Sequence, residues 1–66
     1  MIMLKELDLV ITNSDINDEI KKDSIGVVLS ISNDGKNYLV EFVDKNNNTI
    51  GNGMTIVNEQ QVRLFG

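Results

Sequence analysis

Hydrophobic and polar residues alternate along several short stretches of this chain, the pattern typical of β-strands. The clearest stretch is residues 25–44, where two alternating runs flank a turn that contains Asp34-Gly35. This dipeptide favours a tight hairpin because both residues tolerate a positive φ. The pattern predicts strands over residues 25–32 and 37–43, which we expect to form the middle of a sheet.

Both predicted hairpin strands carry apolar residues on two faces. On the first strand we expect the core face to hold every second residue: Ile25, Val27, Leu29 and Ile31. On the second strand Tyr38, Val40 and Phe42 share one face, and Leu39, Glu41 and Val43 share the other. Gly26 predicts a bulge or a close approach of another backbone. A flat sheet would leave one apolar face in water, so the pattern favours a closed or strongly curled sheet.

Three further strands are predicted outside this hairpin. The first covers residues 7–12, the fourth has two parts (49–50 and 54–57), and the last covers residues 62–64. Between the two parts, Gly51-Asn52-Gly53 predicts a bulge or a kink. A polar turn is expected over residues 44–48, and Asn58 is expected to cap a 3₁₀ turn over residues 58–61.

Residues 13–24 are polar apart from Ile16, Ile20 and the aliphatic parts of two lysines, and they predict a long loop. We expect the two isoleucines to pin this loop to the core, and a single helical turn over residues 15–21 is the alternative. The whole pattern predicts an all-β fold: a small five-stranded SH3-like barrel, forming one domain over residues 1–66. An open four-stranded sheet that dimerises through its second face is the other architecture that fits.

Size and composition argue against catalysis. A chain of 66 residues buries only about 60% of its unfolded surface and has little room for an enclosed substrate cavity. It contains no Cys and no His, which excludes the common zinc sites and thiol or imidazole catalysis. Glu41 and Asp44 would lie about 10 Å apart on opposite faces of a strand, the wrong geometry for a glycosidase. We therefore expect no enzymatic activity, no catalytic residue, no metal and no cofactor.

Ten acidic and six basic residues give a net charge of −4. This balance argues against nucleic-acid binding, which depends on Lys and Arg, and suits a basic protein partner or simple solubility. The N-terminal residues 1–11 are too short to span a bilayer and carry charges where a signal peptide would be apolar. The chain is expected to be cytoplasmic, without membrane contact.

Several short segments of the chain, in a fixed order, carry a family resemblance. They are Leu7-Asp8-Leu9-Val10, Ile20-Lys21-Lys22, Ile25-Gly26-Val27-Val28, Asp34-Gly35, Tyr38-x-Val40-Glu41-Phe42-Val43-Asp44, Thr49-Ile50 and Gln61-Val62-Arg63. Together they resemble a family of small bacterial SH3-like domains of unknown function, over nearly the whole chain. Genes of that family often lie beside toxin-like genes, which implies an antitoxin or immunity role. The chain departs from the family pattern at Asp23, where the family has Gly, and at residues 51–53.

Four carboxylates cluster in the predicted loop: Asp15, Asp18, Glu19 and Asp23. Such a cluster can mimic a phosphate backbone and occupy the basic groove of a nuclease, or it can be a solvated loop. A calcium site is a weaker alternative, because the spacing lacks the EF-hand pattern. If the outer sheet face is an interface, we expect Glu41 and Asp44 to contribute, with Tyr38 beside them.

The leading hypothesis is an immunity protein or antitoxin that neutralises a toxin, most plausibly a basic RNase, by direct contact. It would act as a monomer within a heterodimer, through Asp15, Asp18, Glu19, Asp23, Glu41 and Asp44. The alternative is an SH3-like structural or adaptor module that binds a peptide or a subunit, with no toxin partner.

Overall fold

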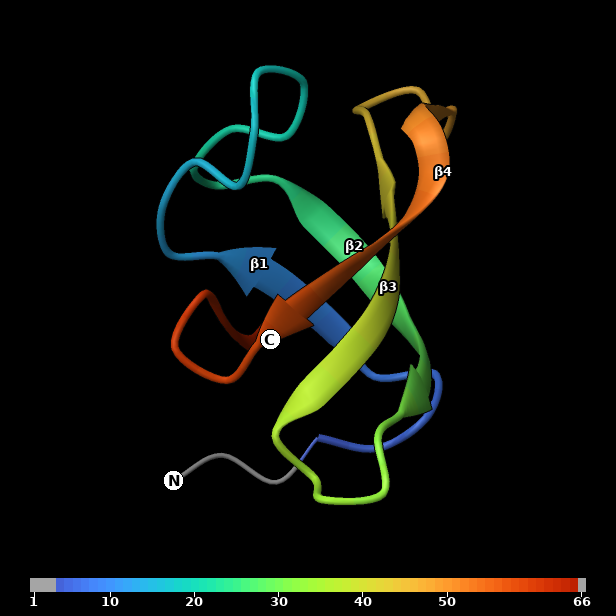
Figure 1. The fold of residues 1–66 in the computed structure, drawn as a ribbon. Coiled ribbons are helices and arrows are strands. Elements are labelled where there is room, and N and C mark those ends of the chain that lie inside the picture. The colour runs from blue at the N-terminus through green and yellow to red at the C-terminus, as the bar shows by residue number, and fades with distance from the viewer. Residues whose placement is uncertain (1–3, 66) are drawn as a thin grey trace.

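The computed structural model describes residues 4–65, with the side chain of Asn52 excepted, so the start of the N-terminal stretch considered above lies outside the described residues. Five strands form one antiparallel sheet in the order β4-β3-β2-β1-β5 (Figure 1). They are β1 (Leu9–Thr12), β2 (Ile25–Ile31), β3 (Asn37–Val43), β4 (Thr49–Asn58) and β5 (Val62–Leu64). The all-β prediction is confirmed. Residues 4–65 include no helix that is long and apolar enough to cross a membrane.

The sheet curls strongly, but its strand pairing does not close. β4 pairs with β3 and β5 pairs with β1, so these two strands are the edges. Within residues 4–65 no ladder joins β4 to β5, and the closed barrel is therefore not confirmed. The connection between them is a single turn in place of the expected 3₁₀ turn, and Asn58 Oδ1 caps it by accepting hydrogen bonds from the N–H groups of Gln60 and Gln61.

Strand boundaries follow the turn residues. β3 and β5 have the predicted bounds. β1 starts at Leu9, two residues later than predicted, because Leu7 has a φ of 71° and cannot continue an extended strand. β4 runs through the glycine pair, where Gly51 has a φ of 65° and Gly53 a φ of 102°, and its register against β3 shifts there. The predicted bulge in this strand is confirmed.

The core face of β2 is the reverse of the predicted one. Val28 is fully buried, whereas Ile25, Val27 and Leu29 are half-buried on the other face. Pairing with β3 decides this, because Val28 lies opposite the buried Val40, and directly paired residues share a face. A register shift between Val28 and Ser30 then returns the side chain of Ile31 to the core.

The core is small and built largely from β-branched residues. Phe42 is its largest fully buried side chain, and Tyr38 is 2% exposed, so the face of β3 that these two residues share is the core face. Gly26 confirms the expected close approach: a Cβ there would lie 2.5 Å from Val40 Cγ1 and 3.0 Å from the Glu41 carbonyl oxygen. The buried apolar set is Leu4, Val10, Ile20, Val28, Tyr38, Val40, Phe42, Val57 and Val62.

Candidate functional site

The loop between β1 and β2 is fastened to the sheet by the buried side chain of Thr12. Its hydroxyl donates a hydrogen bond to the Lys21 carbonyl at 2.8 Å and accepts one from the Ser24 N–H at 2.9 Å. Ile20 is buried in the core, and Ile16 packs against it. The prediction of a loop pinned by two isoleucines is confirmed, and the loop, all of which the structure describes, forms no helical turn.

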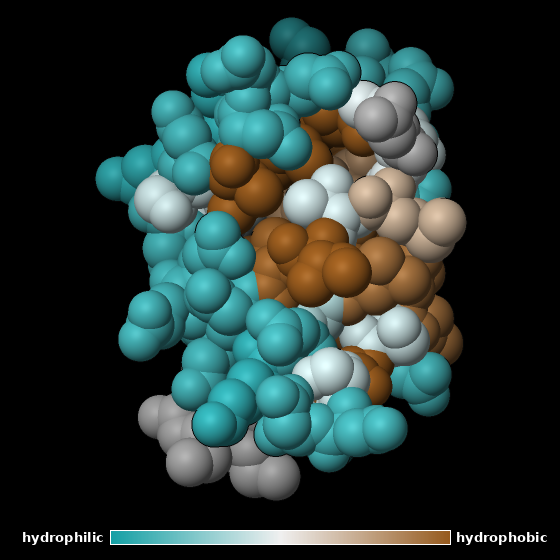
Figure 2. Space-filling view, viewed as in Figure 1, coloured by the Kyte–Doolittle hydropathy of each residue, from teal (hydrophilic) through white to brown (hydrophobic). Residues whose placement is uncertain are grey.

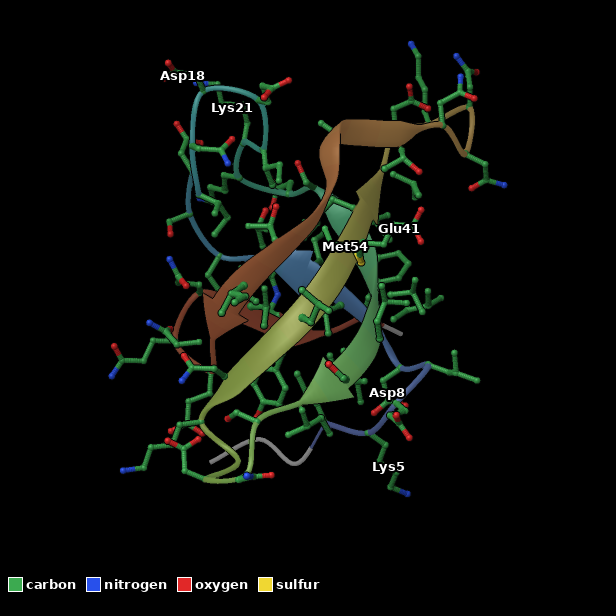
Figure 3. The ribbon with its side chains drawn as sticks, turned by 45° about the vertical axis from the view of Figure 1, so that its right-hand side comes forward. Lys5, Asp8, Asp18, Lys21, Glu41 and Met54 are labelled. Carbon is green, nitrogen blue, oxygen red and sulfur yellow. The ribbon has the colours of Figure 1, made fainter. Side chains whose placement is uncertain are left out.

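The first three loop carboxylates do not converge on one site. Asp15 is held within the loop, where Oδ1 accepts a hydrogen bond from the Lys22 N–H at 2.8 Å. Glu19 lies against β4, with Oε1 3.2 Å from the position that a Cβ on Gly51 would occupy. Asp18 is exposed on the loop (Figure 3).

Asp23 and Asp44 border one hollow of about 260 Å³, at the end of the molecule where the loop meets the β3–β4 turn. Asp23 has a φ of 69°, which an aspartate adopts at some cost, and its Oδ1 lies 3.9 Å from Arg63 Nη2. Asp44 Oδ1 accepts hydrogen bonds from the N–H groups of Asn46 and Asn48 and shapes the turn. The other lining residues are Ser24, Ile25, Val43, Lys45 and Ile50.

Basic side chains dilute the acidity at this end. Lys21 Nζ lies 4.0 Å from Asp15 Oδ2, and Arg63 pairs with Asp23. Two further cations lie on the same two connections: Lys22 and Lys45. The predicted acidic loop therefore carries charges of both signs, and Asp44 shares a hollow with Asp23 alone. We call the loop and the β3–β4 turn together the mixed-charge end.

Glu41 lies apart from these carboxylates, on the sheet face that points away from the core, called here the outer face. Its cross-strand partners are Val27 on β2 and Met54 on β4. The Thr49 hydroxyl donates a hydrogen bond to Glu41 Oε2 at 2.7 Å. Figure 3 shows Glu41 beside Met54 and well away from Asp18. In the part of the chain that the structure describes, Glu41 belongs to neither of the two ion pairs.

Apolar side chains surround Glu41. Strand register places Leu9, Val27, Glu41 and Met54 in one row across four strands, with the cross-strand pair of Leu39 and Ile56 next to it. Leu9 is 48%, Met54 57% and Ile56 69% exposed. Figure 2 shows hydrophobic residues gathered over the middle of the molecule and out to its right-hand edge in this view, with hydrophilic residues to the left and below. We name the outer-face patch by its members around Glu41: Leu9, Val27, Leu39, Val43, Met54 and Ile56.

Sequence reasoning placed Glu41 on an outer face but missed the residues that make this face a surface. Met54 and Ile56 were expected only as parts of a broken strand. The alternation of β4 after Gly53 was the available signal, since it sets these two residues on the face opposite the buried Val57. Tyr38 was wrongly expected beside Glu41 as a contact, because it points into the core from the opposite face of β3.

Two titratable groups have shifted pKa values that folding contacts explain. The Ser32 hydroxyl and the Lys36 N–H donate hydrogen bonds to the Asp34 carboxylate and hold its pKa below its usual value. Burial raises the pKa of Tyr38, and the charge of Glu59 adds to this effect. Among residues 4–65 no three Asp, Glu, His or Cys side chains lie together in a way that could hold a metal ion.

Comparison of the chain with known protein families, with curated proteins and with solved structures gave no match. Two surfaces of the molecule are candidates for a binding function: the mixed-charge end and the outer-face patch.

Proposed function

We propose that this chain is a small non-enzymatic inhibitor, an immunity protein or antitoxin, that neutralises a partner toxin by direct contact. The observation that supports it best is the outer-face patch, with Met54 57% and Ile56 69% exposed. Exposed apolar patches rimmed by polar residues mark protein interaction sites. The absence of Cys and His from the sequence favours binding over chemistry as the mode of action.

The toxin class that suits this chain is a basic nuclease, and we propose an RNase that acts in the cytoplasm. The net charge of −4 would attract a basic partner and raise the association rate. The carboxylates at the mixed-charge end would serve as the rim of the contact, and they are Asp15, Asp18, Glu19, Asp23 and Asp44.

We also propose that the curled sheet is an SH3-like fold. The strand order β4-β3-β2-β1-β5, the long connection after β1 and the tight turn before β5 support this fold. Such a small scaffold can present one sheet face and one long loop to a partner at the same time.

Co-expression tests the proposal. The proposal predicts that a toxin-like reading frame lies beside this gene. That reading frame should arrest growth when expressed alone, and co-expression of this chain should restore growth. Changing Asp18→Lys and Glu19→Lys together should slow association, because rim charges act mainly on the association rate. The matched control is Glu6→Lys together with Glu59→Lys, which makes the same charge change outside the loop. Unrestored growth with a soluble, folded chain would contradict the proposal.

One observation favours the alternative of an adaptor module. A hollow of about 220 Å³ opens beside the β2–β3 turn, between Ile31, Tyr38, Leu39 and Ile56, with Ser30, Ser32 and Asn37 completing its lining. A peptide side chain of moderate size could enter it. Gene neighbourhood separates the two proposals, because an isolated gene favours the adaptor and an adjacent toxin-like reading frame favours the inhibitor.

A further inference from the structure

We infer that the partner docks on the outer-face patch and places one Lys or Arg side chain against Glu41. This inference rests on the proposed function and specifies which surface the partner covers and which chemistry it must bring. It assigns the centre of the contact to β3 and β4 and leaves the loop carboxylates at the rim.

Glu41 is surrounded by apolar residues on the outer face. Its neighbours across the strands are Val27 and Met54, and its neighbours two residues away on β3 are Leu39 and Val43. A protein surface that covered these apolar groups would also remove the carboxylate from water. Burial of an unpaired carboxylate is strongly unfavourable, whereas a paired and hydrogen-bonded one is tolerated. A partner that covers the patch therefore binds best if it brings a cation to pair with Glu41.

The Thr49 hydroxyl orients the Glu41 carboxylate. It donates a hydrogen bond to Glu41 Oε2 at 2.7 Å. We assign Oε1 to the cation of the partner. An acceptor that is already oriented loses less conformational entropy on binding, which favours affinity.

The chain itself does not supply the cation, which argues against a second copy as the occupant. Its basic residues lie outside the patch, in the N-terminal segment, the loops, the turns and β5: Lys5, Lys21, Lys22, Lys36, Lys45 and Arg63. Two copies packed face to face would also bring together two net charges of −4. A different protein, with an apolar contact surface and an accessible Lys or Arg, fits the patch better.

Substitution of a charge at the centre of the contact and of a charge at its rim should change different rate constants. Truncating one member of a buried charge pair acts mainly on the dissociation rate, whereas changing a rim charge acts mainly on the association rate. Glu41 and Asp18 can therefore be separated by measuring both rate constants. If the growth test fails, the association and dissociation rate constants of the Glu41 and Asp18 variants can still be measured with any partner that is captured.

The experiment begins by placing the photocrosslinking residue p-benzoylphenylalanine at Ile56, or at Lys36 as a control, in the full chain in its native host. The crosslinked protein is identified by mass spectrometry and purified for binding kinetics. Glu41→Gln keeps the acceptor for Thr49 and removes the charge, so we expect dissociation to be faster by about tenfold or more, with association changed by less than about twofold. Asp18→Lys should slow association and leave dissociation unchanged.

Three results would overturn the inference: crosslinks from position 36 but not from position 56, crosslinks to a second copy of this chain, or a dissociation rate that Glu41→Gln does not change. Circular dichroism of the Glu41→Gln chain confirms that the variant is folded. A captured protein that shows the expected kinetics but is not toxic would support the docking surface and contradict the proposed function, so the two can fail separately.

Discussion

The Thr49 hydroxyl donates a hydrogen bond to Glu41 at 2.7 Å, on a face where both cross-strand partners of Glu41, Val27 and Met54, are apolar. Strand stability alone would favour a β-branched residue at this position. The carboxylate thus interrupts the apolar row at a cost to the fold, which is typical of residues kept for binding.

Replacing Glu41 by Val should therefore stabilise the folded chain. We predict that Glu41→Val raises the free energy of unfolding by about 0.5 to 1 kcal/mol, because valine suits the strand and extends the cross-strand apolar contacts. Urea unfolding measures this change, with Glu6→Gln as the control for loss of one negative charge. Destabilisation by Glu41→Val would show that the carboxylate contributes to folding.

Thr12 should be the residue on which the order of the loop depends most. Thr12→Val keeps the buried volume but removes two hydrogen bonds, one to the Lys21 carbonyl and one from the Ser24 N–H, so we predict a loss of about 1 to 3 kcal/mol in the free energy of unfolding. Amide exchange in the loop should become faster. Thr49→Val removes a hydroxyl at an exposed position and should cost no more than about 0.5 kcal/mol. Equal effects of the two substitutions would contradict the account of the loop.

Gly26 should tolerate no side chain. A Cβ at this position would meet Val40 Cγ1 at 2.5 Å and the Glu41 carbonyl oxygen at 3.0 Å. We predict that Gly26→Ala lowers the free energy of unfolding by about 1 to 3 kcal/mol through overpacking. Ser30→Ala, at an exposed position on the same strand, is the control and should change it by less than about 0.5 kcal/mol. A stable Gly26→Ala chain would show that β2 and β3 can separate without cost.

The β2–β3 turn should lose stability in acid. Hydrogen bonds from Ser32 and Lys36 lower the folded-state pKa of Asp34, so its contribution is complete above the unfolded-state value of about 4 and is lost as the pH falls through the lower folded-state value. Asp34→Ala should lower the melting temperature at pH 7 and have a smaller effect at pH 3. Asn33→Ala should show no such dependence on pH. An Asp34→Ala effect that does not change with pH would contradict this explanation.

The sequence predicts the strands of this fold better than their faces. Alternation and turn chemistry predicted the bounds of β3 and β5, as well as the bulge at Gly51 and Gly53. The predicted core face of β2 was wrong, because Ile25, Val27 and Leu29 form a more hydrophobic set than Gly26 and Val28. Alternation alone cannot weigh two apolar faces, and the pairing with β3 decides between them.

The candidate site was predictable in part for a related reason. Charge identifies Asp18 and its neighbours directly from the sequence, and alternation places Glu41 on an outer face. Neither signal shows which face of β4 remains open, because that depends on how the sheet curls and where its pairing stops. Met54 and Ile56 could therefore be assigned to a surface only from the structure.

Methyl NMR of the chain during titration with the captured partner locates the contact surface. The outer-face patch offers methyl groups at Leu39, Met54 and Ile56, and Ile16 reports on the loop. If the partner docks on the outer-face patch, the three patch signals shift or broaden at stoichiometric partner, with a smaller change at Ile16. Changes confined to Ile16 and the rest of the loop, with the patch signals unmoved, would contradict docking on this patch.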